Sequence, residues 1–226
     1  MRITFINEVA DLCEQLGADV QKVAKGIGKD KRIGSKFLYA GPGYGGSCFP
    51  KDALALVKTA QGYDSPMRLI ETTVAINETR KRARGRKVVA ACDGRVRGKK
   101  IAILGLTFKP NTDDMRDAPS ITVIQALRAG GAEIHAYDPE GMEASKGMLG
   151  QVTYREDPYE IAGNAGAIVI VTQWDEFRAL DLKRLKTKLK TPTVIDLRNI
   201  YPVAEVKKHG FNYFAVGKKA RVDFLS

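Results

Sequence analysis

Apolar residues in the first part of the chain recur at the spacing of an amphipathic helix. They stand at positions 3, 6, 9, 12, 13 and 16, three or four residues apart, before a possible stop at Gly17. A second, shorter helix is predicted around Val20 to Ala24, before Gly26. Because no capping residue precedes the first helix, we expect its natural start to lie upstream of Met1 and the chain to be truncated.

The helical periodicity then breaks at a glycine-rich stretch, residues 34–50. It contains five glycines and two prolines, but aromatic residues stand between them, which indicates an ordered loop rather than a flexible linker. A helix is expected to follow from about Asp52 to Gly62.

A longer helical pattern, residues 65–92, begins at Ser65-Pro66, where Ser65 would be the N-cap and Pro66 would occupy the first turn. We expect a helix of this length either to pack against another subunit, which would give a homodimer, or to bridge two domains. Between Arg80 and Lys100 there are ten basic residues and one acid. We interpret this cluster as a solvated helix face, with the binding of a phosphate-rich partner as the alternative.

From Gly98 onward, short apolar runs alternate with helical patterns. Strands are predicted at residues 100–106, 133–137, 167–172, 193–196 and 211–216, with helices between them, one of which covers 118–129. This alternation is typical of a parallel, doubly wound sheet. The predicted fold class is therefore α/β, with a helical central region (residues 1–97) that carries the long helix, followed by a Rossmann-like domain (residues 98–226).

Composition and charge narrow the class of protein. The 226 residues carry a net charge of +11, which suits a nucleic acid, an anionic membrane or a phosphorylated small molecule as partner. No apolar run approaches the roughly 20 residues that span a bilayer, and no secretion signal opens the sequence. The three cysteines have no metal-like spacing, so we expect reduced thiols, a cytoplasmic location and no metal site.

One of these cysteines, Cys48, stands where the glycine-rich stretch meets the predicted helix. Backbone amides and the dipole at a helix N-terminus would stabilise a thiolate there, and Lys51 would add to this effect. Asp52 is near enough to accept a proton or to orient a water. Because a cysteine is also commonly a small buried apolar residue, spacing alone leaves both interpretations open. Cys13 and Cys92 lie on helical apolar patterns and are expected to be buried and inert.

The first strand–helix turn of the C-terminal half lacks the features of a dinucleotide site. Its sequence, residues 105–110, has one glycine where a pyrophosphate-binding turn has three, although an acid, Asp138, ends the second predicted strand. We therefore expect that this domain does not hold NAD in the usual way. Lys109 could be a point charge for a phosphate or a surface lysine. Trp174 could pack or cover a nucleotide, and packing is favoured.

Several motifs, in order along the chain, resemble those of the UDP-glucose 6-dehydrogenase family. Residues 43–52, Gly-Tyr-Gly-Gly-Ser-Cys-Phe-Pro-Lys-Asp, look like its active-site signature, and residues 105–116 resemble the motif of its C-terminal domain. Residues 30–38, 137–139, 171–177 and 195–198 also fit, so the resemblance covers essentially the whole chain.

The resemblance implies the NAD-dependent oxidation of UDP-glucose to UDP-glucuronate. In that mechanism Cys48 attacks a C6 aldehyde to give a thiohemiacetal, and a second oxidation yields a thioester that is hydrolysed with the help of Asp52. Lys51 and Arg116 would lie near the cofactor. The implied substrate contacts are Tyr39, Gly41, Gly43, Tyr44, Gly45, Phe108, Lys109 and Arg198, together with Arg32, which would reach into the neighbouring subunit's site.

The sequence also departs from the family and leaves alternatives open. It lacks the family's N-terminal NAD-binding domain, so we expect NAD to be bound mainly outside this chain and the isolated chain to lack sustained turnover. A GDP-mannose 6-dehydrogenase relative is the alternative within the class, while Ser47 and Lys51 argue against a UDP-N-acetylmannosamine type. A basic, non-catalytic nucleic-acid-binding module is the alternative outside it, but no recognition motif supports a nucleic-acid partner.

Overall fold

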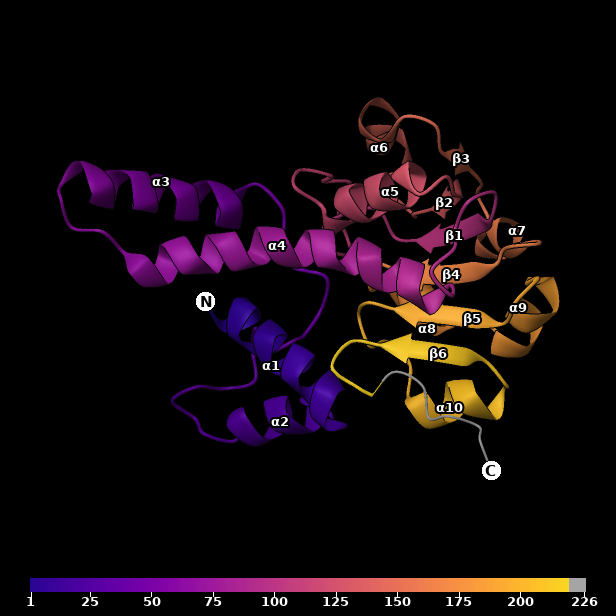
Figure 1. The fold of residues 1–226 in the computed structure, drawn as a ribbon, viewed down its shortest axis with the longest axis horizontal. Helices are drawn as coiled ribbons and strands as arrows, with labels where there is room; N and C mark the ends of the chain where they lie inside the picture. The colour runs from indigo at the N-terminus through magenta and orange to yellow at the C-terminus, as the bar shows by residue number, and fades with distance from the viewer. Residues whose placement is uncertain (220–226) are drawn as a thin grey trace.

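The chain consists of a helical part and a sheet part (Figure 1). The computed structural model describes residues 1–219. The helical part comprises α1 (Arg2–Leu16), α2 (Val20–Ile27), α3 (Cys48–Gly62) and α4 (Arg68–Ala91). In Figure 1, α3 and the first half of α4 run side by side as an arm that projects from the rest of the molecule. The second half of α4 packs on the sheet part, so one helix joins the two.

The sheet part contains a single parallel sheet of six strands in the order β3-β2-β1-β4-β5-β6. This order is that of a doubly wound sheet whose switch point lies between β1 and β4, and it confirms the predicted α/β fold class. The strands are β1 (Lys100–Leu104), β2 (Glu133–Tyr137), β3 (Thr153–Tyr154), β4 (Ala167–Ile170), β5 (Thr193–Asp196) and β6 (Asn212–Ala215). The helices of this part are α5 (Pro119–Ala129), α6 (Met142–Leu149), α7 (Pro158–Ala162), α8 (Asp175–Arg178), α9 (Leu182–Lys188) and α10 (Val203–Lys208).

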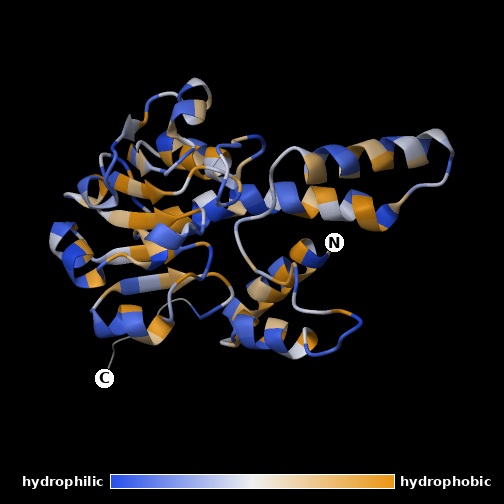
Figure 2. Cartoon of the chain, turned by 180° about the vertical axis from the view of Figure 1, so that it is seen from behind, coloured by the Kyte–Doolittle hydropathy of each residue, from blue (hydrophilic) through white to orange (hydrophobic). Residues whose placement is uncertain are grey.

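Both faces of the central strands are buried. Ile101 and Ile103 of β1 pack into a core with residues of α1, α4 and α5, whereas Ala102 and Leu104 pack into a second core with α7 to α10. Figure 2 shows the strands as mainly hydrophobic segments between mixed helices. Burial on both faces explains why these strands appear in the sequence as uninterrupted apolar runs rather than as an alternation.

Two helix starts differ from the sequence prediction. α3 begins at Cys48 rather than near Asp52. The predicted start of α4 at Ser65-Pro66 is wrong, because α4 begins at Arg68. The N–H of Ser65 donates to the carbonyl of Ala60 at 2.9 Å and completes the end of α3, so Ser65 does not cap α4. The two-residue strand β3 was not expected at all.

The interpretation of the basic cluster as a solvated face is wrong for three of its six basic residues in α4, whereas Arg82 and Arg86 are exposed as expected. Arg80, Lys81 and Arg84 are only 5%, 1% and 4% exposed. The carboxylate of Asp11 on α1 accepts from Nη1 of Arg80 at 2.8 Å and from Nη2 of Arg84 at 2.6 Å. Buried cations persist only when such partners offset the loss of hydration. These three side chains are therefore internal contacts and are not available to the phosphates of a nucleic acid.

Candidate active site

Cys48 is the first residue of α3, at the point where the glycine-rich loop ends. Its side chain is exposed, and its Sγ lies 3.7 Å from the Oγ of Ser47. The N–H groups of a first helical turn lack partners within the helix, so partial positive charge gathers around this thiol. Cys13 and Cys92 are buried, as expected, and burial raises the pKa of both thiols. Cys48 is thus the thiol that a ligand can reach.

Asp52 lies one turn further along α3, and its carboxylate is 3.7 Å from the Nζ of Lys51. It also lines a cavity of about 320 Å³ together with Phe37, Tyr44 and Phe49. The ring centroid of Phe49 is 6.1 Å from that of Phe37 and 6.2 Å from that of Tyr44. The first turns of α3 therefore carry a thiol, a carboxylate and an ammonium group next to an aromatic wall.

The glycine-rich loop between residues 41 and 46 is held by polar side chains of α1 and α4. The N–H of Gly41 donates to Oδ1 of Asn7 at 2.8 Å, and its carbonyl accepts from Nε of Arg80 at 2.8 Å. Asn77 of α4 binds both backbone groups of Tyr44. A loop with this many fixed backbone contacts is ordered, which agrees with the sequence interpretation.

The same loop lies directly against the sheet part. The N–H of Gly46 donates to the carbonyl of Arg116 at 2.8 Å. A Cβ atom on Gly46 would come within 2.8 Å of the Phe108 ring, and a Cβ atom on Gly45 would overlap the carbonyl of Asp117. Contacts this short are possible only for glycine. The glycines thus allow the loop that ends at Cys48 to touch the turns after β1.

Arg198 joins this contact from the end of β5. Its Nε donates to the carbonyl of Val171 at 2.7 Å and its Nη2 to the carbonyl of Phe108 at 3.2 Å, while its Nη1 lies 3.2 Å from where a Cβ of Gly41 would be. Burial lowers the pKa of the Arg198 guanidinium to about 10, against the opposing charge of Asp196. A cation therefore lies where the glycine-rich loop meets the carboxyl ends of the strands.

The remaining candidate residues have exposed side chains. Lys109 is exposed, with its Nζ 5.3 Å from the centroid of the Phe108 ring. Arg116 is exposed and bound to Asp114, whose hydrogen bonds raise the pKa of the arginine. Tyr39 is 73% exposed. The guanidinium of Arg32 is exposed and binds Asp30 at 2.6 Å, and none of its hydrogen bonds within residues 1–219 reaches another candidate residue. One chain thus brings Gly41, Gly43, Tyr44, Gly45, Cys48, Phe108, Arg116 and Arg198 into one region.

The turn after β1 does not fit the pyrophosphate and ribose of NAD. The carboxylate of Asp138 is fully buried and accepts from the backbone N–H groups of Leu106, Thr107 and Gly141. A carboxylate used in this way is not free to bind a ribose hydroxyl. Nε1 of Trp174 also donates to Asp138, at 3.1 Å, and its side chain is 7% exposed, which confirms the packing interpretation of this tryptophan.

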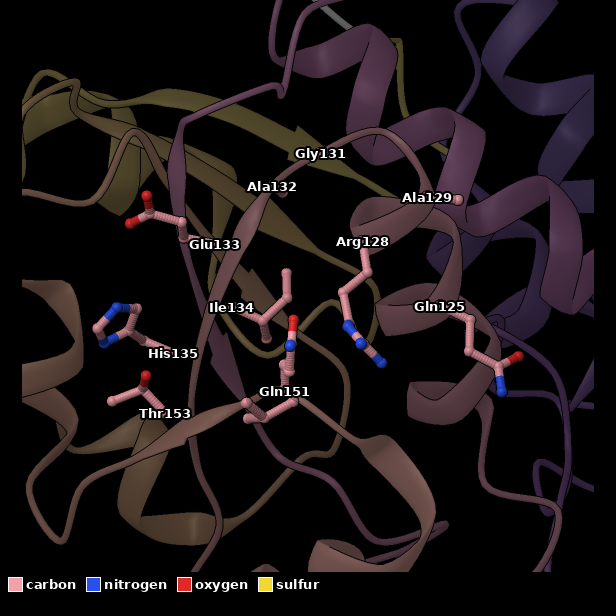
Figure 3. A pocket seen from close by; sticks show the side chains of 11 residues that line it. Gln125, Arg128, Ala129, Gly131, Ala132, Glu133, Ile134, His135, Gln151 and Thr153 are labelled. Carbon is pink, nitrogen blue, oxygen red and sulfur yellow. The ribbon is translucent and has the colours of Figure 1, made fainter.

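A larger cavity, of about 820 Å³, lies elsewhere in the sheet part (Figure 3). It is bordered by α5, β2 and β3, with Arg128, Glu133, His135, Gln151 and Thr153 among its polar residues. None of the candidate site residues lines it. Among residues 1–219, no group of His, Cys, Asp and Glu side chains is arranged to hold a metal ion, and no helix combines the length and apolar character needed to cross a membrane.

Sequence analysis missed the residues that hold the loop: Asn7, Asn77, Arg80 and Lys81. A weak signal was present, since Asn77, Arg80 and Lys81 fall at i, i+3 and i+4 of one helix and therefore on one face. Lone polar residues in a helix more commonly face water, so only their burial distinguishes them.

Comparison with known proteins agrees with this arrangement. The family model described as UDP-glucose/GDP-mannose dehydrogenase family, central domain, matches residues 1–79, and the one described as the UDP binding domain of the same family matches residues 102–203. A UDP-glucose 6-dehydrogenase of Rhizobium meliloti is 65% identical over 218 residues, which are 96% of this chain and 50% of that protein. One from Rickettsia bellii is 43% identical over 220 residues, 96% of this chain and 51% of that protein.

Among solved structures, a UDP-glucose dehydrogenase of Pyrobaculum islandicum superposes with a TM-score of 0.83 at 33% identity, over 96% of this chain and 48% of that one. The chain spans about half the length of the curated relatives it matches. Two successive domain models of one family cover the helical and the sheet parts, and the structural match covers both parts together. The chain therefore belongs to the UDP-glucose/GDP-mannose dehydrogenase family.

Proposed function

We propose that this chain forms the UDP-sugar-binding, thiol-bearing part of an NAD-dependent UDP-glucose 6-dehydrogenase. The observation that carries the proposal is the contact between the loop ending at Cys48 and the carboxyl ends of the strands, where Phe108 and Arg198 lie. Ligands of doubly wound sheets bind at that end, next to the switch point. A nucleotide there would place its attached sugar toward the exposed thiol.

In the proposed reaction, Cys48 is the nucleophile. The C6 alcohol of the sugar would first lose a proton, and a hydride to NAD, to become an aldehyde. The Cys48 thiolate then adds to the C6 carbonyl, a C–S bond forms, and the carbonyl oxygen takes a proton to give a thiohemiacetal. A second oxidation would give the thioester. Water then adds to the same carbon and the C–S bond breaks, which releases the Cys48 thiolate and a carboxylate product. Asp52, one turn along α3, would accept a proton from that water. The hydride acceptor, NAD, would be bound mainly outside this chain, with Lys51 and Arg116 near it.

The substrate would be held by the two faces of the contact. Residues 39–45, with Gly41, Gly43 and Gly45, allow close backbone approach to the sugar and phosphates. Phe108 offers a ring, and the ammonium of Lys109 and the guanidinium of Arg198 offer positive charge for the diphosphate. UDP-glucose is the proposed substrate, and a GDP-mannose relative is the alternative that the titration below distinguishes.

Calorimetric titration of the chain with UDP-glucose, UDP and GDP-mannose tests the proposal. We expect UDP-glucose and UDP to bind and GDP-mannose to give no heat of binding. Lys109→Met should weaken both uridine ligands about tenfold, because one ammonium–phosphate contact contributes about 1.4 kcal/mol. Lys183→Met, at an exposed lysine of α9, is the matched control and should leave the affinity unchanged. Binding of GDP-mannose instead of UDP-glucose would reassign the substrate, and no binding of any nucleotide would refute the proposed site.

We also propose that a second copy covers the arm formed by α3 and α4. α3 contributes no buried residue within one chain, and Leu54, Leu56 and Leu69 are 54%, 43% and 73% exposed. The first two belong to α3 and the third to α4, and exposed apolar side chains on neighbouring elements mark an interaction surface. In such a dimer the exposed Arg32 would be free to reach the neighbouring site.

Light scattering should therefore give twice the chain mass of 24.8 kDa. Leu54→Glu combined with Leu69→Glu should shift the chain to the monomer, because two carboxylates would have to be buried in the interface. Leu12→Glu, at an equally exposed leucine of α1, is the control and should stay dimeric. A wild-type monomer at micromolar concentration would contradict this assembly.

A further inference from the structure

One face of α4 carries three polar side chains that the proposed reaction does not use. Asn77, Arg80 and Lys81 are 3%, 5% and 1% exposed. They do not lie in the apolar cores but at the junction between α4, the glycine-rich loop and the turn before α5. Burying three polar side chains there costs desolvation free energy that an apolar face would avoid, so their contacts call for an explanation.

Asn77 hydrogen-bonds to the loop through both the oxygen and the nitrogen of its side-chain amide. Its Oδ1 accepts from the N–H of Tyr44 at 2.9 Å, and its Nδ2 donates to the carbonyl of Tyr44 at 3.0 Å. A Cβ atom on the preceding residue, Gly43, would come within 3.0 Å of the same Oδ1, and Gly43 has a φ of 119°. Both backbone groups of Tyr44 are thus fixed by one side chain, four residues before Cys48.

Lys81 ties the same loop to the sheet part. Its Nζ lies 2.6 Å from Oδ1 of Asp117 and 2.9 Å from Oε1 of Glu78, and its Cγ is 3.2 Å from where a Cβ of Gly43 would be. The carbonyl of Asp117 in turn faces Gly45. A buried ammonium needs these carboxylates, so the loop, α4 and the turn at Asp117 are fixed as one unit.

We propose that Asn77 and Lys81 are positioning residues that hold Cys48 within reach of a UDP-sugar bound at the carboxyl ends of the strands. This inference rests on the proposed function. Positioning of this kind raises the effective concentration of a nucleophile at a bound substrate without changing how the nucleophile reacts in solution. It therefore predicts a difference between a ligand-directed reaction of Cys48 and an undirected one.

The test compares two alkylating reagents on the full chain: iodoacetamide, and a haloacetyl group linked to UDP. In both reactions the Cys48 thiolate forms a C–S bond to the reagent and halide leaves. Wild-type chain should be labelled faster by the UDP-linked reagent, and free UDP should compete. Asn77→Leu should lose about tenfold or more of that advantage when the UDP-linked reagent is saturating, while its iodoacetamide rate stays within about twofold of wild type. Cys48→Ser provides the blank.

Conservative and matched variants separate positioning from general stability. Lys81→Arg keeps the charge and should still be labelled faster by the UDP-linked reagent than by iodoacetamide. Arg82→Gln, at the exposed neighbour, should behave as wild type. Asp117→Asn weakens the Lys81 contact without backbone strain, since asparagine tolerates the φ of 52° found there. It should lose part of the advantage, and it carries the test if Asn77→Leu fails to fold.

The outcomes are distinct. Folded Asn77→Leu and Asp117→Asn chains that keep the full UDP-dependent advantage would overturn the positioning role and leave the proposed function intact. A wild-type chain with no UDP-dependent advantage would overturn the proposed function and the positioning role with it.

Discussion

Replacing Asp138 with alanine is expected to lower the free energy of unfolding by about 4 kcal/mol. The Asp138 carboxylate is 0% exposed. Its Oδ2 accepts from the N–H of Leu106 at 2.6 Å and from Nε1 of Trp174 at 3.1 Å, and its Oδ1 accepts from the N–H of Gly141 at 2.7 Å. Alanine would leave these buried donors without acceptors, and each unpaired donor costs about 1–3 kcal/mol.

Urea unfolding of wild type and variant measures this difference. Asp138→Asn should fall between them, because both oxygens accept in the wild type and the amide would point a donor at other donors. Asp157→Ala is the matched control: this aspartate caps α7 through one hydrogen bond, to the N–H of Tyr159, and its loss should cost about 1 kcal/mol. An Asp138→Ala chain within 1 kcal/mol of wild type would contradict the account of the turn after β1.

The Asp138 position also separates what the sequence predicts from what only the structure shows. An acid at the end of the second strand fits both a ribose-binding carboxylate and a carboxylate that organises its own turn. The sequence analysis rejected the first use from the missing glycines of residues 105–110, and the contacts of Asp138 show the second use directly. Only coordinates reveal which donors surround a buried carboxylate.

The central strands β1 and β4 were predictable because they are buried on both faces and appear as apolar runs. The two-residue β3 escaped because it is too short to have a period. The burial of Arg80 and Arg84 escaped for another reason: their partner, Asp11, belongs to α1, far away in the sequence. The sequence of α4 by itself indicates a basic helix. In the folded chain, acids of α1 neutralise the helix face that carries Arg80 and Arg84.

The candidate site also contains residues that the sequence identified and residues that it did not. Cys48 and its neighbours form one contiguous motif, so residue order alone identified them. Asn77 and Lys81 act on that motif through space, and only their i, i+4 spacing on one helix face marks them in the sequence. The start of α3 was also misplaced, because the proline at position 50 suggested loop, although a proline is well tolerated in the first turn of a helix.

Gly45→Ala is expected to weaken the binding of UDP-glucose about 100-fold or more. The added methyl group would overlap the carbonyl oxygen of Asp117 and lie 2.8 Å from its carbonyl carbon, and backbone atoms cannot rotate away as a side chain can. The loop must therefore move off the turn at Asp117, and the shift also displaces its contacts with Phe108 and Arg116. Loss of two charge-assisted contacts with the nucleotide, at about 1.4 kcal/mol each, is enough for a loss of this size. Overpacking should also lower the free energy of unfolding by about 2 kcal/mol.

Gly26→Ala provides the control that makes this result interpretable. Gly26 lies inside α2 with nothing within 4 Å of an added Cβ, so alanine should raise the free energy of unfolding by about 0.5–1 kcal/mol and leave nucleotide binding unchanged. Urea unfolding should therefore show opposite changes in the free energy of unfolding for the two Gly→Ala variants, and calorimetry should show weaker UDP-glucose binding only for Gly45→Ala. If Gly45→Ala binds UDP-glucose as tightly as wild type, the contact between the loop and the sheet part does not form the UDP-glucose site. The sugar would then bind away from Cys48.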